Sequence, residues 1–317
     1  MSDKDAHLAN VALLYYGEGL TQSEIAQRLG VSRPTIVNLL RESRERGIVE
    51  IRVEGEVLAA SNLSRLLCQK FNLKDAYVSQ SRGESAPPAD RAEALAQVAR
   101  VAAMALIDIV KPGDSIGVAW GETIKAVSSV IGNARIDGVT VCQMIGSMVS
   151  DRVPASEDCA IRIANCFGAT CFTLHAPAVL SSAELANALK IEPTIAAQLK
   201  RFDNLDVAVF SVGNMAASTH LAGAGIAQAS DIETAEASGA RGVVCCRYID
   251  AQGNALQQPP QERIVAIEVD QLRRIERKLL VVAGEDRKDA ALAVLNGGLA
   301  THLCVDEALA HALLEAG

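Results

Sequence analysis

Residues 20–40 place the strongest constraint on the fold, because their spacing predicts two helices joined by a tight turn. Thr21 followed by Glu24 is the pattern of a capping box, which begins a helix. Gly30 predicts the end of that helix, since glycine adopts the left-handed C-terminal conformation at little cost. Ser32 is a favoured N-cap residue and predicts the start of a second helix directly afterwards.

Apolar side chains at helical spacing give both helices a buried face. Ile25 and Leu29 lie four residues apart on the first helix, and Ile36, Leu39 and Leu40 continue the pattern on the second. This is the spacing of a helix-turn-helix, whose second helix enters the major groove of DNA. The alternative is a helical hairpin that belongs to some other core.

Polar side chains on the outer face of these helices are the candidate DNA contacts. Short polar residues at the start of the second helix can reach base edges, and arginines can bind guanine or phosphate. The predicted contacts are Gln22, Ser32, Arg33, Thr35, Asn38 and Arg41. We expect a helix at 7–16 to complete the core. Apolar and polar side chains alternate over residues 48–53, which predicts a strand. This strand would make the N-terminal domain a winged helix-turn-helix.

Charge is divided unevenly along the chain. The net charge is −8, which is unsuited to binding nucleic acid over the whole surface. Residues 1–53 nevertheless carry seven basic and seven acidic side chains, and residues 28–46 hold five arginines against two glutamates. A basic face on an acidic chain favours a DNA-binding domain at 1–54 joined to a second domain at 55–317, although a solvated helix face would carry the same charges.

From residue 55 onward, strands and helices alternate. A coupling segment at 55–75 comes first, with a helix expected at 56–71. Strands are then expected at 76–79, 114–120, 139–145, 170–174, 207–212, 242–248, 264–267, 278–283 and 302–305, and helices at 91–110, 123–131, 156–167, 181–200, 287–296 and 306–315. This alternation predicts a doubly wound, mostly parallel α/β sheet covered on both faces. Such sheets bind ligands at the carboxyl ends of their strands.

Four predicted strands end in polar turns that contain glycine. Glycine lets backbone amides approach a ligand, and the N-terminus of the following helix favours anions. A lysine that opens a helix can also bind an anion. The candidate ligand residues are Gly121, Glu122, Thr123, Gly146, Gly213, Asn214 and Lys288.

The order of motifs along the chain resembles the SorC family of bacterial transcriptional regulators. The resemblance covers nearly the whole chain. It is carried by Leu14-Tyr15-Tyr16 before 19–26, by Gly117-Val118-Ala119-Trp120-Gly121-Glu122-Thr123, by His175-Ala176-Pro177, by 206–213, by Gly239-Ala240-Arg241-Gly242 with 248–253, by Lys288 and by Val305-Asp306-Glu307. It implies a helix-turn-helix head joined to a sugar-binding domain. That domain would resemble sugar-phosphate isomerases and deaminases, with catalysis lost and the ligand site kept as a sensor.

The resemblance also implies how the parts act. Gly121, Glu122 and Thr123 would form a cradle for an anion or a hydroxyl, Lys288 would be the basic contact, and Asn214 would face the same site. The expected effector is a sugar, a polyol or a sugar phosphate, and the expected assembly is a homotetramer, a dimer of dimers, on double-stranded operator DNA. Val243 stands where relatives often carry an acidic residue, and Glu122 stands where some phosphate binders carry a hydroxyl.

The remaining observations narrow the function. No residue spacing demands catalysis or a metal site, so we expect no cofactor and no enzyme activity. The eight cysteines are typical of reduced cytosolic thiols, and adjacent Cys245 and Cys246 are expected to pack along a strand. No long apolar run or secretory signal is evident, so we expect a cytoplasmic protein without membrane contact.

Two functions follow from these patterns. The first is an effector-controlled transcriptional regulator of a carbohydrate-metabolism operon. The alternative is a sugar-phosphate isomerase or deaminase with an incidental N-terminal helical hairpin, in which Glu122 would be the general base.

Overall fold

The computed structural model describes residues 3–49, 62–79, 91–148, 155–216 and 227–316. The chain divides into two compact units, Met1–Val53 and Glu54–Gly317.

The first unit is a small helical bundle. It contains α1 (Asp3–Ala12), the π-helix η1 (Leu13–Gly17), α2 (Gln22–Leu29) and α3 (Arg33–Glu45). The helix predicted at 7–16 therefore begins earlier, and its last turn widens into a π-helix. Its apolar core consists of the fully or nearly buried side chains Val11, Leu14, Ile25, Ala26, Ile36 and Leu40.

The strand predicted at 48–53 is not found in the part of it that the structure describes. Ile48 and Val49 lie outside any strand, and their amides both donate to the Ser43 carbonyl at the end of α3. Residues 50–53, which would complete the strand, lie outside the described residues.

The second unit is built on a 7-stranded sheet in the order β1-β10-β9-β5-β2-β3-β4, with every neighbouring pair parallel. The strands are β1 (Asp75–Ser79), β2 (Ser115–Val118), β3 (Thr140–Gln143), β4 (Thr170–Phe172), β5 (Val207–Phe210), β9 (Arg277–Val282) and β10 (His302–Asp306). The mostly parallel α/β fold is thus confirmed. Near-continuous burial of β5, β9 and β10 fits a sheet with both faces covered.

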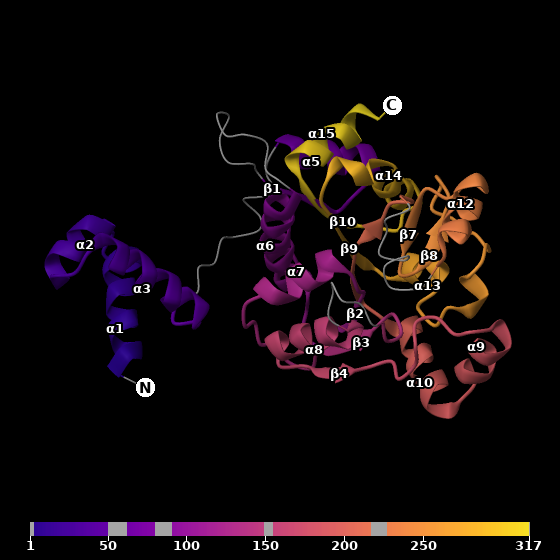
Figure 1. Ribbon diagram of the computed structural model, residues 1–317, viewed down its shortest axis with the longest axis horizontal. Helices are drawn as coiled ribbons and strands as arrows, with labels where there is room; N and C mark the ends of the chain where they lie inside the picture. The colour runs from indigo at the N-terminus through magenta and orange to yellow at the C-terminus, as the bar shows by residue number, and fades with distance from the viewer. Residues whose placement is uncertain (1–2, 50–61, 80–90, 149–154, 217–226, 317) are drawn as a thin grey trace. The chain divides into compact units, whose positions relative to one another are not determined.

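Helices cover this sheet in rows (Figure 1). One row contains α6 (Arg91–Ile109), α7 (Glu122–Val130) and α8 (Ser156–Phe167), which pack side by side. In another, α5 (Asn62–Phe71) and α15 (Glu307–Glu315) pack together beside β1. The remaining helices are α9 (Ala183–Lys190), α10 (Pro193–Arg201), α12 (Ala229–Ala237), α13 (Val269–Arg274) and α14 (Lys288–Asn296), with short 3-10 turns η2 (Phe202–Asn204), η3 (Gln261–Arg263) and η4 (Glu285–Arg287).

Three sequence expectations for this unit are wrong. The helix expected at 181–200 is two helices, because Pro193 opens a new one at its first position. The strand expected at 264–267 makes only isolated bridges, such as Ile145 with Ala266. Helices α12 and α13, in addition, have no counterpart among the predicted elements.

The third wrong expectation is the single strand at 242–248, because these residues form a hairpin. The antiparallel strands β7 (Gly242–Val244) and β8 (Arg247–Ile249) pair in a 3-stranded sheet with β6 (Val212–Gly213). Cys245 and Cys246 are the two turn residues, with φ of 49° and 66°. They therefore do not alternate along a strand, although both are buried. The left-handed backbone at both positions is what a tight two-residue hairpin requires.

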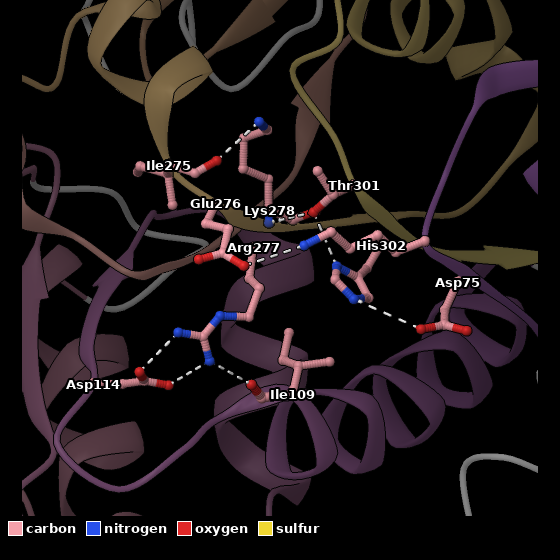
Figure 2. Close-up of polar contacts among 10 residues, drawn as sticks. Asp75, Ile109, Asp114, Ile275, Glu276, Arg277, Lys278, Thr301 and His302 are labelled. Carbon is pink, nitrogen blue, oxygen red and sulfur yellow. Dashed lines mark hydrogen bonds and ion pairs between the residues drawn. The ribbon is translucent and has the colours of Figure 1, made fainter.

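Buried polar side chains close the amino edge of the sheet (Figure 2). Arg277, at the start of β9, forms two bonds with Asp114, which lies just before β2, at 2.6 and 2.8 Å, and a third with the Ile109 carbonyl at 2.8 Å. The hydrogen bonds with Asp114 raise the pKa of Arg277. Nearby, Lys278 Nζ donates to the carbonyls of Arg273 and Ile275. Apart from Arg277 Nε, which is buried without a partner among the described residues, the nitrogen atoms of Arg277 and Lys278 are therefore hydrogen-bonded to other groups of the chain.

A close backbone contact gives a direct test of the packing around α14. A Cβ atom added at Gly297 would lie 2.7 Å from the Gly253 Cα and 2.8 Å from the Gln252 carbonyl oxygen. We expect Gly297→Ala to lower the free energy of unfolding by about 1–3 kcal/mol, because backbone atoms must move to admit the methyl group. The matched control is Gly213→Ala, whose nearest atom would be 3.8 Å away. Equal melting temperatures for the two variants would contradict this packing.

Candidate functional site

The first helix of the predicted helix-turn-helix begins and ends, and the second begins, at the residues expected from the sequence. Thr21 and Glu24 form a complete capping box at the start of α2, and Gly30 ends the helix with φ of 68°. The Ser32 side chain accepts from the Thr35 amide at the start of α3. These local contacts fix the turn between α2 and α3.

The predicted DNA contacts lie on the outside of this pair of helices. Ser32, Arg33, Thr35, Asn38 and Arg41 are exposed, and Gln22 is half-buried. Ile36 and Leu40 point into the core from the same helix. The outer face of α3 is therefore polar and accessible, as a recognition helix requires.

Two of these side chains touch one another across the turn. Arg33 Nε donates to Gln22 Oε1 at 3.4 Å, which joins the first residue of α3 to the first residue of α2. Both belong to an open hollow of about 640 Å³, whose other lining residues are Tyr15, Tyr16, Gly19, Leu20, Thr21 and Ser23. Tyr15 and Tyr16 of the π-helix thus stand beside the predicted DNA face, a position that the spacing of residues 20–40 did not indicate.

The ion pairs on this face are weak enough to leave the arginines available. Arg28 pairs with Glu18 and Arg41 with Glu45, both at 3.6 Å, and about half or more of each of these side chains is exposed. Exposed pairs of this kind contribute about 0–1 kcal/mol. Phosphate groups of DNA can therefore replace the carboxylates at little cost.

The candidate ligand residues of the second unit follow neighbouring strands. β2 lies between β3 and β5, and the chain adds strands first on one side of β2 and then on the other. This is the topological switch point, where open α/β sheets bind ligands. Gly121, Glu122 and Thr123 follow β2, Gly213 and Asn214 follow β5, and Lys288 follows β9.

Hydrogen bonds join three of these strand ends. Thr123 Oγ1 accepts from Arg287 Nη1 at 3.3 Å, which connects the start of α7 to η4. Asn214 Nδ2 donates to the Asp286 carbonyl at 3.1 Å and to its carboxylate at 3.0 Å. Asp286 also pairs with Arg91, at the start of α6, at 3.7 Å. The loops after β2, β6 and β9 therefore meet at the carboxyl edge.

The individual candidates differ in what they offer a ligand. Gly121 is the N-cap of α7 with φ of 133°, and Lys288 opens α14, where its side chain makes no polar contact within the described part of the chain. Gly213 is partly engaged, since it pairs with Val243 in the small sheet. Gly146 is engaged by packing, because its amide donates to the Val265 carbonyl and a Cβ there would lie 2.6 Å from the Ala176 oxygen.

Sequence reasoning missed Arg287, the most unusual group at this edge. Its side chain is 6% exposed, and its Nε atom is buried without a hydrogen-bond partner. Burial lowers the pKa of Arg287, with Arg91 adding to the shift and Asp286 and Glu122 opposing it. Arginine is rarely buried, so a sequence gives no sign of it. The only local indication was its place in the polar run before Lys288.

No group of three or more His, Cys, Asp and Glu side chains among the described residues could hold a metal ion. Among the helices described, none is long and apolar enough to cross a membrane.

Comparisons with known proteins cover both units. Residues 56–315 match the Sugar-bind family model, described as "Putative sugar-binding domain", and residues 6–56 match the MarR_2 model of the MarR family. The chain is 35% identical over 311 residues to the uncharacterized transcriptional regulator YjhU of Escherichia coli K12, covering 98% of this chain and 94% of that one. It is 29% identical over 304 residues to the deoxyribonucleoside regulator of Bacillus subtilis, covering 96% and 95%.

A solved structure gives the same picture. The full-length sorbitol operon regulator SorC from Klebsiella pneumoniae superposes with a TM-score of 0.77 at 25% identity, covering 99% of this chain and 100% of that one. The fold, the helix-turn-helix head and the sequence matches agree, and the chain belongs to the SorC family of sugar-binding transcriptional regulators.

Proposed function

We propose that this chain regulates a carbohydrate-metabolism operon by binding operator DNA with residues 1–54 and a small carbohydrate effector with residues 55–317. The observation that carries the proposal is the polar, exposed face of α3, held by caps at Thr21 and Ser32 above its own apolar core. Base contacts would come from Ser32, Thr35 and Asn38, and phosphate or guanine contacts from Arg33 and Arg41, with Gln22 supporting Arg33.

The effector would bind at the carboxyl edge of the sheet. Gly121, Glu122 and Thr123 at the start of α7, Asn214 and Lys288 surround the point where the strand order reverses, which supports this assignment. Gly213 and Gly146 would shape the adjoining backbone. The amino edge is a weaker alternative: although Arg277 Nε is buried there without a partner in the described part of the chain, both terminal nitrogens of Arg277 are bonded to Asp114, and Lys278 Nζ donates to two carbonyls.

The assembly would be a homotetramer, a dimer of dimers, in the cytoplasm. Two heads on one symmetric operator would read half-sites about 10–10.5 base pairs, or a multiple of that, apart. Effector binding would change the relative placement of subunits and hence the spacing of the heads, which couples the two sites. The proposal assigns no enzyme activity to the second domain.

Fluorescence anisotropy tests the function directly. A labelled fragment from upstream of the gene is titrated with the full-length chain at about 0.15 M salt, against a scrambled fragment of equal composition. We expect specific binding to be about 10³-fold or more tighter than binding to the scrambled fragment. Equal affinity for the two fragments would overturn the proposal. Consumption of a sugar phosphate without specific DNA binding would favour the isomerase or deaminase alternative.

A lysine variant tests the effector site. Lys288→Met keeps the length of the side chain and removes its charge, so we expect the affinity for an anionic effector found in the titration to fall about tenfold or more, the effect of losing a charged hydrogen bond. Lys200→Met, near the end of α10, is the matched control. An unchanged effector response in Lys288→Met would remove Lys288 from the site.

A further inference from the structure

The carboxyl edge of the sheet holds a guanidinium group whose bonding is incomplete. Arg287 is 6% exposed, donates one hydrogen bond to Thr123 Oγ1 at 3.3 Å, and leaves Nε buried without a partner. Its other terminal nitrogen donates no hydrogen bond within the described part of the chain. A buried charge is normally paired or hydrogen-bonded on every side, because desolvation is costly.

The surroundings of Arg287 indicate a place for an anion. Thr123 lies in the first turn of α7, a helix of 9 residues, so the guanidinium is bonded to the turn whose amides have no partner within the helix. Ser211, directly after β5 in the sheet order β9-β5-β2, also has a buried hydroxyl without a partner. Two unsatisfied polar groups therefore lie after neighbouring strands at this edge.

The charge balance limits what kind of anion fits. Glu122 is the first residue of α7, at the position where a phosphate would take the helix amides, and Asp286 lies directly before Arg287. Both carboxylates act on Arg287 from close by. A doubly charged phosphate at this point would face the Glu122 carboxylate at the start of α7, whereas Asp286 already pairs with Arg91. A carboxylate is planar and matches the paired N–H groups of a guanidinium. It also carries half the charge of the phosphate, so Glu122 repels it less.

We propose that Arg287 is the anion-recognising residue of the effector site and that the effector is a polyhydroxy acid, bound through its carboxylate. The proposal rests on the effector site proposed above and narrows its ligand to a singly charged hydroxycarboxylate. Lys288 and Asn214 would then contact hydroxyl groups beside that carboxylate. If the effector instead binds through a phosphate group, phosphate will stabilise the chain more than glycolate does.

The experiment compares two small anions on the full-length chain by thermal unfolding at constant ionic strength. The probes are glycolate, the smallest 2-hydroxycarboxylate, and inorganic phosphate, with sodium chloride as the reference salt. At concentrations several times its dissociation constant, we expect glycolate to raise the melting temperature by about 2 °C or more. We expect phosphate to raise it less. No stabilisation by either anion, or a larger effect of phosphate, would overturn the proposal.

Three variants locate the effect. In Arg287→Met the glycolate shift should disappear, whereas the exposed Arg162→Met should keep it. Without any anion, Arg287→Met should melt at or above the temperature of the unmodified chain, because an incompletely bonded buried charge has been removed. A large fall in the melting temperature of Arg287→Met without anion, or a glycolate shift that persists in this variant, would contradict the proposal and leave Arg287 with a structural role.

The third variant tests selectivity without changing Arg287. Glu122→Gln removes one resident negative charge, and a doubly charged anion gains more from this than a singly charged one, so we expect the ratio of phosphate affinity to glycolate affinity to rise at least several-fold. An unchanged preference would contradict the charge argument. All of these measurements are made without DNA, so they can fail while operator binding succeeds, and the two proposals are judged separately.

Discussion

Replacing Asp114 by alanine is expected to destabilise the sheet domain by about 3–5 kcal/mol, because it leaves the buried Arg277 guanidinium without its counter-ion. Asp114 and Arg277 have side chains only 8% and 10% exposed, and they share two hydrogen bonds. The same carboxylate accepts from the Lys111 amide at 2.6 Å, so one substitution leaves a charge and a backbone donor unsatisfied. At about 2–4 °C per kcal/mol, the melting temperature should fall by roughly 6–20 °C.

Two further variants separate the buried charge from general damage. Glu276 is the exposed residue next to Arg277, and its carboxylate pairs with Lys74 at 3.4 Å on the surface. Glu276→Ala should therefore change the free energy of unfolding by about 0–1 kcal/mol. Asp114→Ala combined with Arg277→Met should be more stable than Asp114→Ala alone, since no unpaired charge remains. If the double variant is the less stable of the two, the pair does not act as described.

Replacing both Arg33 and Arg41 by alanine is expected to weaken operator binding by about 30-fold or more, at roughly 1–3 kcal/mol for each arginine–DNA contact. Both side chains are exposed on the outer face of α3, eight residues apart, and point away from the core residues Ile36 and Leu40. Where they bind phosphate, the slope of log affinity against log salt should fall by about one for each arginine–phosphate pair that the substitution removes.

The matched control variant has the same change in net charge, but the substituted arginines lie in the sheet domain. Arg65→Ala with Arg162→Ala also removes two exposed arginines, from α5 and α8 of the sheet domain. Anisotropy titrations of both double variants, at two salt concentrations, show whether the α3 arginines contact DNA directly or only attract it through the overall charge of the protein. Equal losses of affinity in the two would mean that α3 does not bind DNA through these arginines.

Local signals explain which parts of the fold could be predicted from the sequence. Thr21, Gly30 and Ser32 act through hydrogen bonds or backbone angles within three or four residues, so their pattern was sufficient for α2 and α3. Pro193 is also a local signal, and it should have divided the helix expected at 181–200. The alternation of strands and helices likewise predicted the parallel sheet.

The errors arise where distant contacts decide. The run 242–248 is largely apolar, and no Asn-Gly or Gly marks the turn at Cys245 and Cys246, so it resembled one strand. Arg287 shows the same limit at the candidate site. Its sequence neighbours are Asp286 and Lys288, and only folding places its guanidinium beside Thr123.

The separation of the two cores affects how such regulators can evolve. The buried apolar clusters of the head and of the sheet domain, as far as the structure describes them, share no side chain. A recombination event near residue 54 could therefore attach another head without disturbing the interior of either half. The DNA address and the chemical signal can then be inherited and selected independently, which would let one sensor serve many promoters.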